Sequence, residues 1–142
     1  MTVCVLLHRH GDWLLGLRAP GVAYAPGRLG LVGGHVEVDA PAADVLEATG
    51  RREVAQEIGL DLTGVPLTYL ESEYFVTEGG EGQVTVTFLA PAPAGQDPRV
   101  AVPAELTDVG WWTSDRAAAD PRCPDWLPAL LRRADEADRP GP

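Results

Sequence analysis

The chain has 142 residues, of which 45% are apolar and 23% are charged, the size and composition of one ordinary globular domain. These values exclude collagen-like, coiled-coil and wholly disordered chains. There are 21 acidic residues against 11 basic ones, all arginine, so the formal net charge is −10. Because such a chain repels nucleic-acid backbones and anionic membranes, we expect neither as a partner. An anionic substrate would need local positive charge, for which a divalent metal ion is the obvious candidate.

The two cysteines and the N-terminus favour a cytoplasmic protein. Cys4 and Cys123 lie far apart in the sequence, with no metal-ligand spacing around either. The apolar run at residues 2–7 is too short for a secretory signal and has no basic start. No stretch approaches the roughly 18 apolar residues that a membrane span needs. We therefore expect a cytoplasmic location, reduced thiols and no membrane partner.

The first part of the chain predicts a β-hairpin followed by a loop. Residues 2–7 and 13–18 are rich in strand-forming side chains and are separated by a short polar turn. Prolines and glycines over residues 19–29 indicate a surface loop. The chain then runs through Leu29–Val32 to Gly33-Gly34, and a short extended piece is expected after the glycines, at residues 35–38.

A helix is predicted from about Asp44 to Ile58. Asp44 with Glu47 three residues later forms a fair capping box. Gly59 suits the left-handed conformation just past a helix end. The helix is therefore bounded at both ends by local signals.

The second part of the chain predicts a sheet that is completed and covered by a second helix. Strands are expected at residues 67–75, 83–90 and 108–113. The loop over residues 90–103 is rich in proline, alanine and glycine, and we expect it to be exposed and mobile. Asp125 can cap a helix from Trp126 to about residue 137, with Pro128 in its first turn. We expect one α+β domain over residues 1–137, a mixed sheet packed by helices, with a short frayed tail at 138–142.

One face of the first predicted helix carries Glu53, Gln56 and Glu57. At about 100° per residue the three side chains fall within an arc of about 100°. Val54, Ala55 and Ile58 fall on the other side. Two carboxylates on one face make a plausible Mg²⁺ seat. Taken alone, the acidic face is also consistent with a solvated helix surface, and Gly33-Gly34 with an ordinary turn.

The order and spacing of these residues resemble the Nudix box, G-x5-E-x7-R-E-U-x-E-E-x-G-U with U aliphatic, of the Nudix (MutT-like) hydrolase family. Residues 52–60, REVAQEIGL, match the second half at every defined position but one. Residues 33–37, GGHVE, look like its usual opening, and the resemblance extends over about residues 2–135. It implies the Nudix fold, an α/β/α sandwich with a mixed β-sheet between helices. It also implies hydrolysis of a nucleoside diphosphate linked to another group, X, by water attack on phosphorus with Mg²⁺ or Mn²⁺.

The resemblance assigns roles by position. Glu57 would be a metal ligand, Gln56 a weakened one, and Glu53 a ligand or general base. Arg52 would orient Glu53, and the Gly33 carbonyl would complete the coordination.

Two departures from the family pattern affect this assignment. The spacing from Gly34 to Arg52 is four residues too long, which places an insertion within residues 38–43 and puts Asp44 at the box's first acid. Gln56 replaces the first of the paired glutamates and so offers an amide oxygen without charge. These changes affect the expected catalysis and the number of bound metal ions more than they affect the expected fold.

Further site residues are expected outside the box helix. Glu105, six residues before Trp111, is positioned as the extra acid that family members often supply from a loop; Glu78 and Glu81 are the runners-up. Gly34 and His35 are expected near the phosphates. Trp111 and Trp112 should point to opposite faces of one strand, with one in the core and Trp112 assigned to the substrate cleft. The other aromatic side chains available for stacking are Tyr24, Tyr74, Phe75 and Phe88.

The leading hypothesis is a metal-dependent hydrolase of nucleoside triphosphates or related nucleoside diphosphate derivatives, a nucleotide pyrophosphatase of the MutT type. Gln56 favours a different class, a catalytically weakened Nudix domain that binds a nucleotide or metabolite as a sensor or interaction module. The retained Glu53 and Glu57 favour the enzyme. A structural domain without a ligand is the third class. Homodimers are common in the family, and the sequence leaves this open.

Overall fold

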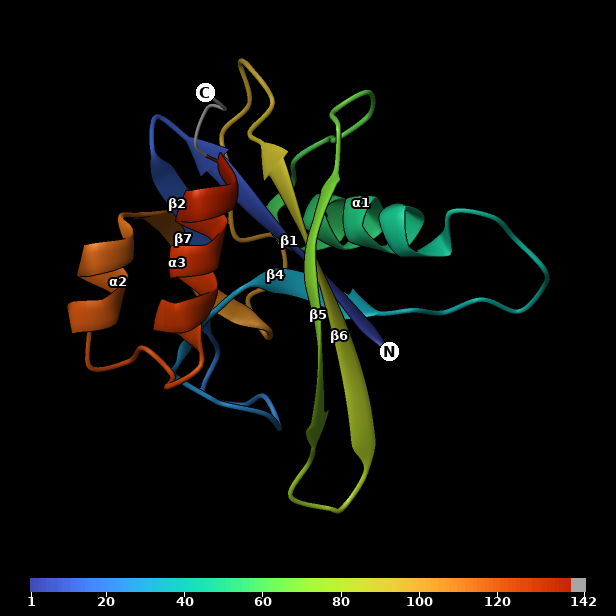
Figure 1. Cartoon of the computed structure of the whole chain (residues 1–142), viewed down its shortest axis with the longest axis horizontal. Helices are drawn as coiled ribbons and strands as arrows, with labels where there is room; N and C mark the ends of the chain where they lie inside the picture. Colours follow the sequence, from blue (N-terminus) through green and yellow to red (C-terminus); the bar gives the residue numbers. More distant parts are fainter. Residues whose placement is uncertain (139–142) are drawn as a thin grey trace.

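The computed structural model describes residues 1–138, which form a seven-stranded sheet with helices on both faces (Figure 1). The strands are β1 Thr2–Arg9, β2 Asp12–Arg18, β3 Leu29–Gly30, β4 Val32–His35, β5 Thr68–Val76, β6 Gly82–Pro91 and β7 Leu106–Trp112. The helices are α1 Val45–Ile58, α2 Ser114–Ala119 and α3 Leu127–Asp138. No helix within residues 1–138 has the length and apolar character that crossing a membrane requires.

The sheet is mixed, as predicted. β1 runs parallel to β6 along the register Thr2↔Thr85 to His8↔Pro91, and β5 pairs antiparallel with β6. β1 pairs antiparallel with both β2 and β4, and β2 pairs antiparallel with β3 and β7. The central β1 is therefore bonded to three strands, and its side chains are buried on both faces.

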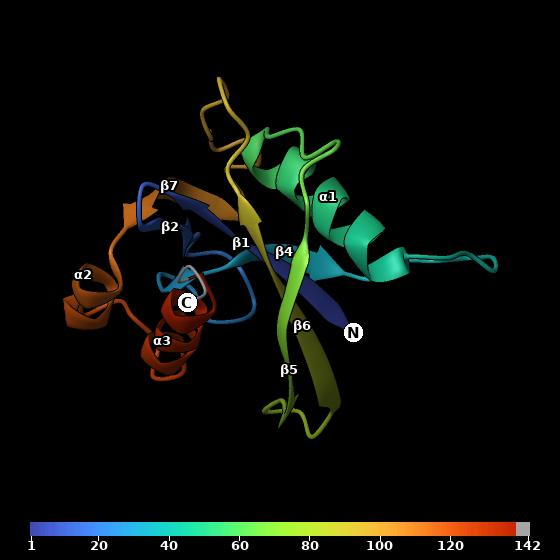
Figure 2. The same ribbon diagram turned by 45° about the horizontal axis from the view of Figure 1, so that its top comes forward.

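Each face of the sheet has its own apolar core. Val5 and Leu7 of β1 pack with Val54 and Ile58 of α1, whereas Leu6, between them in sequence, packs on the other face with α3. Alternation along a strand produces this division, since successive side chains point to opposite faces. We call these the α1 face and the α3 face; Figure 2 shows α1 on one side of the sheet and α2 and α3 on the other. The α/β/α sandwich is confirmed.

The predicted first helix is confirmed over Val45–Ile58, but its start differs from the expectation. Asp44 has φ 53° and ψ 38°, and its side chain makes no capping hydrogen bond, so the predicted capping box is wrong. A capping residue normally has an extended backbone, which the left-handed Asp44 does not. Gly59 has φ 72° and donates its N–H to the Ala55 carbonyl, as predicted. Ala55 is exposed, whereas Val54 and Ile58 are fully buried.

The glycine pair belongs to a strand, and the extended piece expected after it is only partly formed. β4 includes Gly33 and Gly34, which pair with Cys4 and Val3 of β1, and the strand ends at His35 rather than continuing to residue 38. A Cβ atom on Gly33 would lie 2.2 Å from the Val3 carbonyl oxygen. Glycine is therefore needed here for close backbone approach rather than for a turn.

The loop between β6 and β7 is held against α1, contrary to the expectation of a mobile segment. Arg99 and Ala101 donate their backbone N–H groups to the carbonyls of Ile58 and Glu57, at 3.0 and 2.9 Å. These bonds satisfy carbonyls that the end of a helix leaves free. The loop is thereby fixed beside the carboxylate-bearing end of α1.

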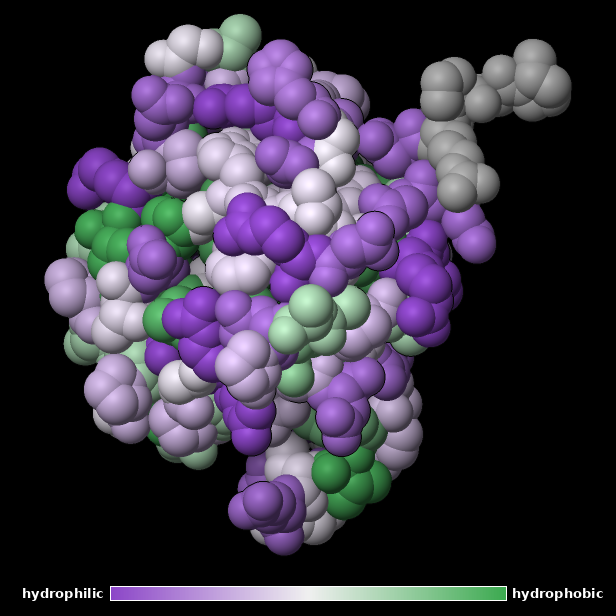
Figure 3. Space-filling view, turned by 90° about the vertical axis from the view of Figure 1, so that its left-hand side faces the viewer, coloured by the Kyte–Doolittle hydropathy of each residue, from purple (hydrophilic) through white to green (hydrophobic). Residues whose placement is uncertain are grey.

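The C-terminal part contains one helix that was not predicted from the sequence. α2 begins after Thr113, whose side-chain oxygen accepts a hydrogen bond from the Arg116 N–H at 3.1 Å. α3 begins at Leu127 and includes Asp138, one residue beyond the predicted helix end; the rest of the predicted tail, residues 139–142, lies outside the described residues. Seen from the side of α2 and α3, hydrophilic side chains dominate, and apolar groups form small separate patches (Figure 3).

Candidate active site

Glu57 is the most perturbed carboxylate on the α1 face. Its Oε2 accepts a hydrogen bond from the Gly33 N–H at 3.3 Å. Burial, hydrogen bonding with Glu105 and the charges of Glu105 and Glu53 together raise the pKa of Glu57 to about 8, although the Gly33 N–H lowers it. The structure therefore brings the predicted residues Glu53, Glu57 and Glu105 within electrostatic reach of one another. Glu78 and Glu81, the runners-up, lie in the turn between β5 and β6.

Arg52 and Gly34 define the position of Glu53. The Arg52 guanidinium donates to Glu53 Oε1 at 3.2 Å and to the His35 carbonyl at 3.0 Å, so it links the helix to the end of β4. A Cβ atom on Gly34 would lie 2.4 Å from the Glu53 carboxyl carbon. Gly34 thus leaves the space that the Glu53 carboxylate fills. His35 is exposed at this edge, and its ring Nδ1 lies 3.3 Å from Thr2 Oγ1.

Gln56 is exposed on the same helix, one residue before Glu57. Its amide oxygen can act as a neutral ligand in place of a carboxylate. The loss of one charge weakens the attraction of this helix face for a cation at contact distance.

The residues at this edge fit a divalent metal ion by their chemistry. Carboxylate, amide and backbone carbonyl oxygens are the ligands that Mg²⁺ and Mn²⁺ prefer. The raised pKa of Glu57 reports carboxylates crowded in a half-buried place, and a cation would relieve that crowding. Within residues 1–138 no three His, Cys, Asp or Glu side chains form a ready-made cage. Mg²⁺ sites commonly use one or two carboxylates together with waters and substrate phosphates.

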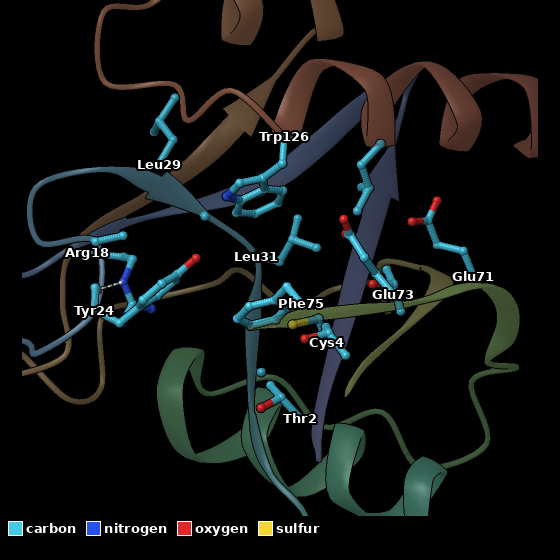
Figure 4. Close-up of a pocket in the computed structure, with 16 residues that line it drawn as sticks. Thr2, Cys4, Arg18, Tyr24, Leu29, Leu31, Glu71, Glu73, Phe75 and Trp126 are labelled. Atoms are coloured by element: carbon cyan, nitrogen blue, oxygen red, sulfur yellow. Dashed lines mark hydrogen bonds between the residues drawn. The ribbon is translucent and has the colours of Figure 1, made fainter. Parts of the chain in front are cut away.

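A pocket of about 300 Å³ opens on the α3 face and meets the carboxylate edge at Gly33, which lines it (Figure 4). Gly33 lies between the two sites, because its N–H is bonded to Glu57. Cys4, its neighbour on β1, also lines the pocket; burial raises the pKa of this thiol to about 12, so it stays protonated. The pocket and the carboxylate edge are therefore adjacent at Gly33.

Aromatic side chains from distant segments surround the pocket. Tyr24 and Phe75 lie together, with ring centroids 6.4 Å apart and planes 28° apart, and Trp126 projects toward the pocket from the segment preceding α3 (Figure 4). Tyr24 is 55% exposed and Trp126 is 38% exposed. Exposed aromatic rings at the mouth of a pocket are suited to stacking on a planar ligand.

The other predicted aromatic residues lie elsewhere. Trp111 and Trp112 occupy opposite faces of β7, as expected, but Trp112 packs at the α3-face core beneath Arg116 and does not line the 300 Å³ pocket. Phe88 is buried, and Tyr74 is exposed and does not line the pocket. Trp126 was not predicted as a site residue, because no local pattern indicates where the segment before α3 lies.

The charged residues that line the pocket, Arg18, Glu71 and Glu73, were not predicted from the sequence either. Glu71, Glu73 and Phe75 alternate along β5 and so share the pocket face of that strand. This period-two pattern is visible in the sequence. What it faces depends on α3 and on the loop that carries Tyr24, which only the folded chain brings together.

Comparisons with known proteins agree with this geometry. The NUDIX domain family model matches residues 1–133. A MutT NUDIX hydrolase from Burkholderia pseudomallei is similar, with 26% identity and a TM-score of 0.73, over 93% of this chain and 95% of that one. The NUDIX domain of NrtR from Shewanella oneidensis, solved with ADP ribose, has 25% identity and a TM-score of 0.73, over 96% of this chain and 86% of that one.

A NUDIX hydrolase from Nitrosomonas europaea shares the fold, with 18% identity and a TM-score of 0.75, over 97% of this chain and 89% of that one. Comparison with curated proteins found no match. The family match covers nearly the whole chain and includes the helix, the glycines and the carboxylates described above. This chain belongs to the NUDIX family and is a hydrolase of the phosphoanhydride type.

Proposed function

We propose that this protein hydrolyses a nucleoside diphosphate linked to another group, with nucleoside triphosphates as the leading substrates and Mg²⁺ or Mn²⁺ as the cofactor. The observation that carries the proposal is the meeting of Glu53, Glu57 and Glu105 beside Gly33, where an aromatic pocket opens on the other face. Carboxylates at one end and stacking surfaces at the other suit a ligand with a phosphate chain and a base.

The metal ion, when bound, would neutralise the phosphates and lower the pKa of the attacking water. Glu57, Glu53, the amide oxygen of Gln56 and the carbonyl of Gly33 are the groups that would hold it. The bound cation would also offset part of the net charge of −10, which without it would repel the substrate.

Glu53 is the proposed general base. Arg52 holds its carboxylate at 3.2 Å and is itself fixed to the His35 carbonyl, so the group that accepts the water proton is oriented before the substrate arrives. Attack of the water oxygen on phosphorus breaks the anhydride P–O bond, and the diphosphate or other phosphate leaves with the bonding electrons. Glu105 lies beside Glu57 and is a second acceptor at the same edge, while Gly34 and His35 face the phosphate end.

The ligand is proposed to be a small nucleotide rather than a nucleic acid, since the acidic surface disfavours polyanions that extend beyond the site. A cytoplasmic location, with Cys4 and Cys123 as free thiols, is proposed as well. A homodimer is possible in this family, and the molecular mass in solution would distinguish it from a monomer.

The test is release of phosphate and pyrophosphate from a nucleotide panel in Mg²⁺, in Mn²⁺ and in EDTA. We expect metal-dependent turnover that falls by about 10²–10⁴-fold in Glu53→Gln. Glu78→Gln, which makes the same charge change in the exposed β5–β6 turn, should behave as the unaltered protein. Turnover that is equal in EDTA, or equal in Glu53→Gln, would contradict the proposal.

A second candidate is a nucleotide- or metabolite-binding sensor that has lost efficient turnover. Gln56 favours it, because the helix face lacks one carboxylate. A NUDIX domain of a different protein, NrtR, was solved with ADP ribose. Thermal stabilisation by a nucleotide without any metal-dependent turnover would support this candidate over the enzyme.

A further inference from the structure

The pocket on the α3 face is charged in opposite senses at its two sides. Arg18 lies on one side, where its guanidinium donates to the Tyr24 carbonyl at 2.7 Å, and Glu73 lies on the other (Figure 4). The two charged side chains therefore face the pocket from opposite sides.

Glu73 is the carboxylate in this pocket that has no partner within residues 1–138. Glu71, two residues earlier on β5, is bound at both oxygens by the Arg133 guanidinium of α3, with Nη2 to Oε2 at 2.9 Å. Glu73 makes no such hydrogen bond or ion pair with the described residues, although its charge contributes to raising the pKa of Arg133. It lines the pocket beside Phe75, so its acceptor oxygens are available to a ligand.

An ionised carboxylate accepts hydrogen bonds at both oxygens and donates none. Among the common bases, guanine presents two adjacent donors on its Watson–Crick edge, N1–H and the 2-amino group. Adenine and cytosine each place an acceptor nitrogen beside their single amino group, and uracil places carbonyl oxygens on both sides of its N–H. Against adenine, cytosine or uracil, one carboxylate oxygen would therefore face an acceptor atom of the base and be repelled by it.

We propose that Glu73 determines base specificity by accepting both donors of a guanine edge while the ring stacks against the Tyr24, Phe75 and Trp126 surfaces. The inference rests on the proposed function, because it takes the pocket to be the base end of the same site. It adds the substrate class, guanine nucleotides, and a specificity residue that lies outside the family's sequence box. Of the two carboxylates that line the pocket, Glu71 already binds Arg133, which leaves the oxygens of Glu73 for the ligand.

The test separates base recognition from turnover by using monophosphates, which contain no anhydride to hydrolyse. Affinities for GMP, IMP and AMP are measured by calorimetry in Mg²⁺ with the full chain. IMP lacks only the 2-amino group, so one charge-assisted hydrogen bond is removed without a change in stacking. We expect GMP to bind about ten-fold or more tightly than IMP or AMP.

Glu73→Gln should reduce the preference for GMP over IMP to about two-fold or less, because the amide offers one acceptor in place of two. Glu73→Ala should abolish it. Glu78→Gln is the matched control for charge and should keep the preference. Equal affinities for the three monophosphates in the unaltered protein, or a guanine preference that survives in Glu73→Gln, would overturn the inference.

The same variants are then assayed for hydrolysis of GTP, ITP and ATP. Turnover with no base preference would leave the hydrolase proposal standing and refute the role of Glu73. Guanine-selective binding without turnover would support the role of Glu73 and refute the hydrolase proposal. If the monophosphates do not bind but the triphosphates are hydrolysed, the ratio of kcat/KM for GTP to that for ITP tests the role of Glu73, with the same preference of about ten-fold expected. If no monophosphate binds and no triphosphate is hydrolysed, both proposals are refuted.

Discussion

On the α1 face of the sheet, the acidic and glycine residues of the site come mostly from one stretch of chain, residues 33–57. On the α3 face, the pocket is lined by side chains from segments scattered between residues 2 and 130. The two faces meet at Gly33, whose N–H is bonded to Glu57 and whose other side borders the pocket. The proposed reactive groups therefore depend on local geometry, whereas the groups that would select a ligand depend on the packing of the whole domain.

Replacing Gly33 or Gly34 by alanine should give the largest difference in effect, although the two glycines are adjacent where the two faces meet. A Cβ atom on Gly33 would lie 2.2 Å from a backbone oxygen of β1, which cannot move without opening the sheet. We expect Gly33→Ala to cost about 3 kcal/mol or more of the free energy of unfolding. A Cβ atom on Gly34 would meet the flexible end of Glu53 instead, so Gly34→Ala should fold.

Gly34→Ala should nevertheless lose about 100-fold in kcat, since a displacement of about 1 Å in a catalytic group has effects of that size. Urea unfolding and steady-state kinetics on both variants check the pair. Equal stability losses in the two variants, or a Gly34→Ala enzyme with normal kcat, would show that Glu53 does not depend on this space.

The aromatic side chains on the α3 face should affect binding more than chemistry. Trp126→Ala or Phe75→Ala removes a stacking surface that is worth about 1–3 kcal/mol per base, so KM should rise by about 5- to 150-fold while kcat changes little. Tyr74→Ala is the matched control for Phe75, because the two are neighbours on opposite faces of β5. A fall in kcat at constant KM would place these rings near the reacting atoms instead.

The carboxylates on the α1 face predict a pH dependence of stability for the metal-free protein. The pKa of Glu57 is raised from 4.5 to about 8 in the folded chain, so the folded state holds a proton that the unfolded state releases between these values. Stability contributed by this group is therefore lost as the pH rises from about 4.5 to about 8. Glu57→Gln removes the effect.

In EDTA at pH 8.5 we expect Glu57→Gln to be more stable than the unaltered protein by about 1–2 kcal/mol, because solvent screening at this half-buried group lowers the full effect. At pH 4.5 the two should unfold at the same temperature. Thermal unfolding across this pH range measures the difference. A variant that is less stable at pH 8.5 would mean that Glu57 is held by partners that favour its charge.

The sequence predicted the two faces unequally well, for a physical reason. Glu53 and Glu57 were predicted together because helical periodicity alone places them on one face, and Gly59 because a helix end needs a left-handed residue. The capping role predicted for Asp44 is wrong, because its backbone is left-handed, and that conformation depends on the path of the loop before the helix. Trp126 and Glu73 could not be placed, because no local pattern says that β5 and the start of α3 border one pocket.

The smallest expected effect concerns Arg133, which binds Glu71 at the far side of the pocket. The pair lies at the surface, so Arg133→Gln should change stability by less than about 1 kcal/mol. The variant leaves Glu71 without its counter-ion beside Glu73, and the added negative charge should weaken binding of a nucleotide by a few-fold. Glu71→Gln in the same background removes that charge and should restore binding, whereas Arg132→Gln, a neighbouring exposed arginine, should leave it unchanged. If Arg133→Gln binds nucleotides as tightly as the unaltered protein, the charge at this side of the pocket does not affect ligand affinity. The contrast between a reactive α1 face and a selective α3 face would then rest on the aromatic rings alone.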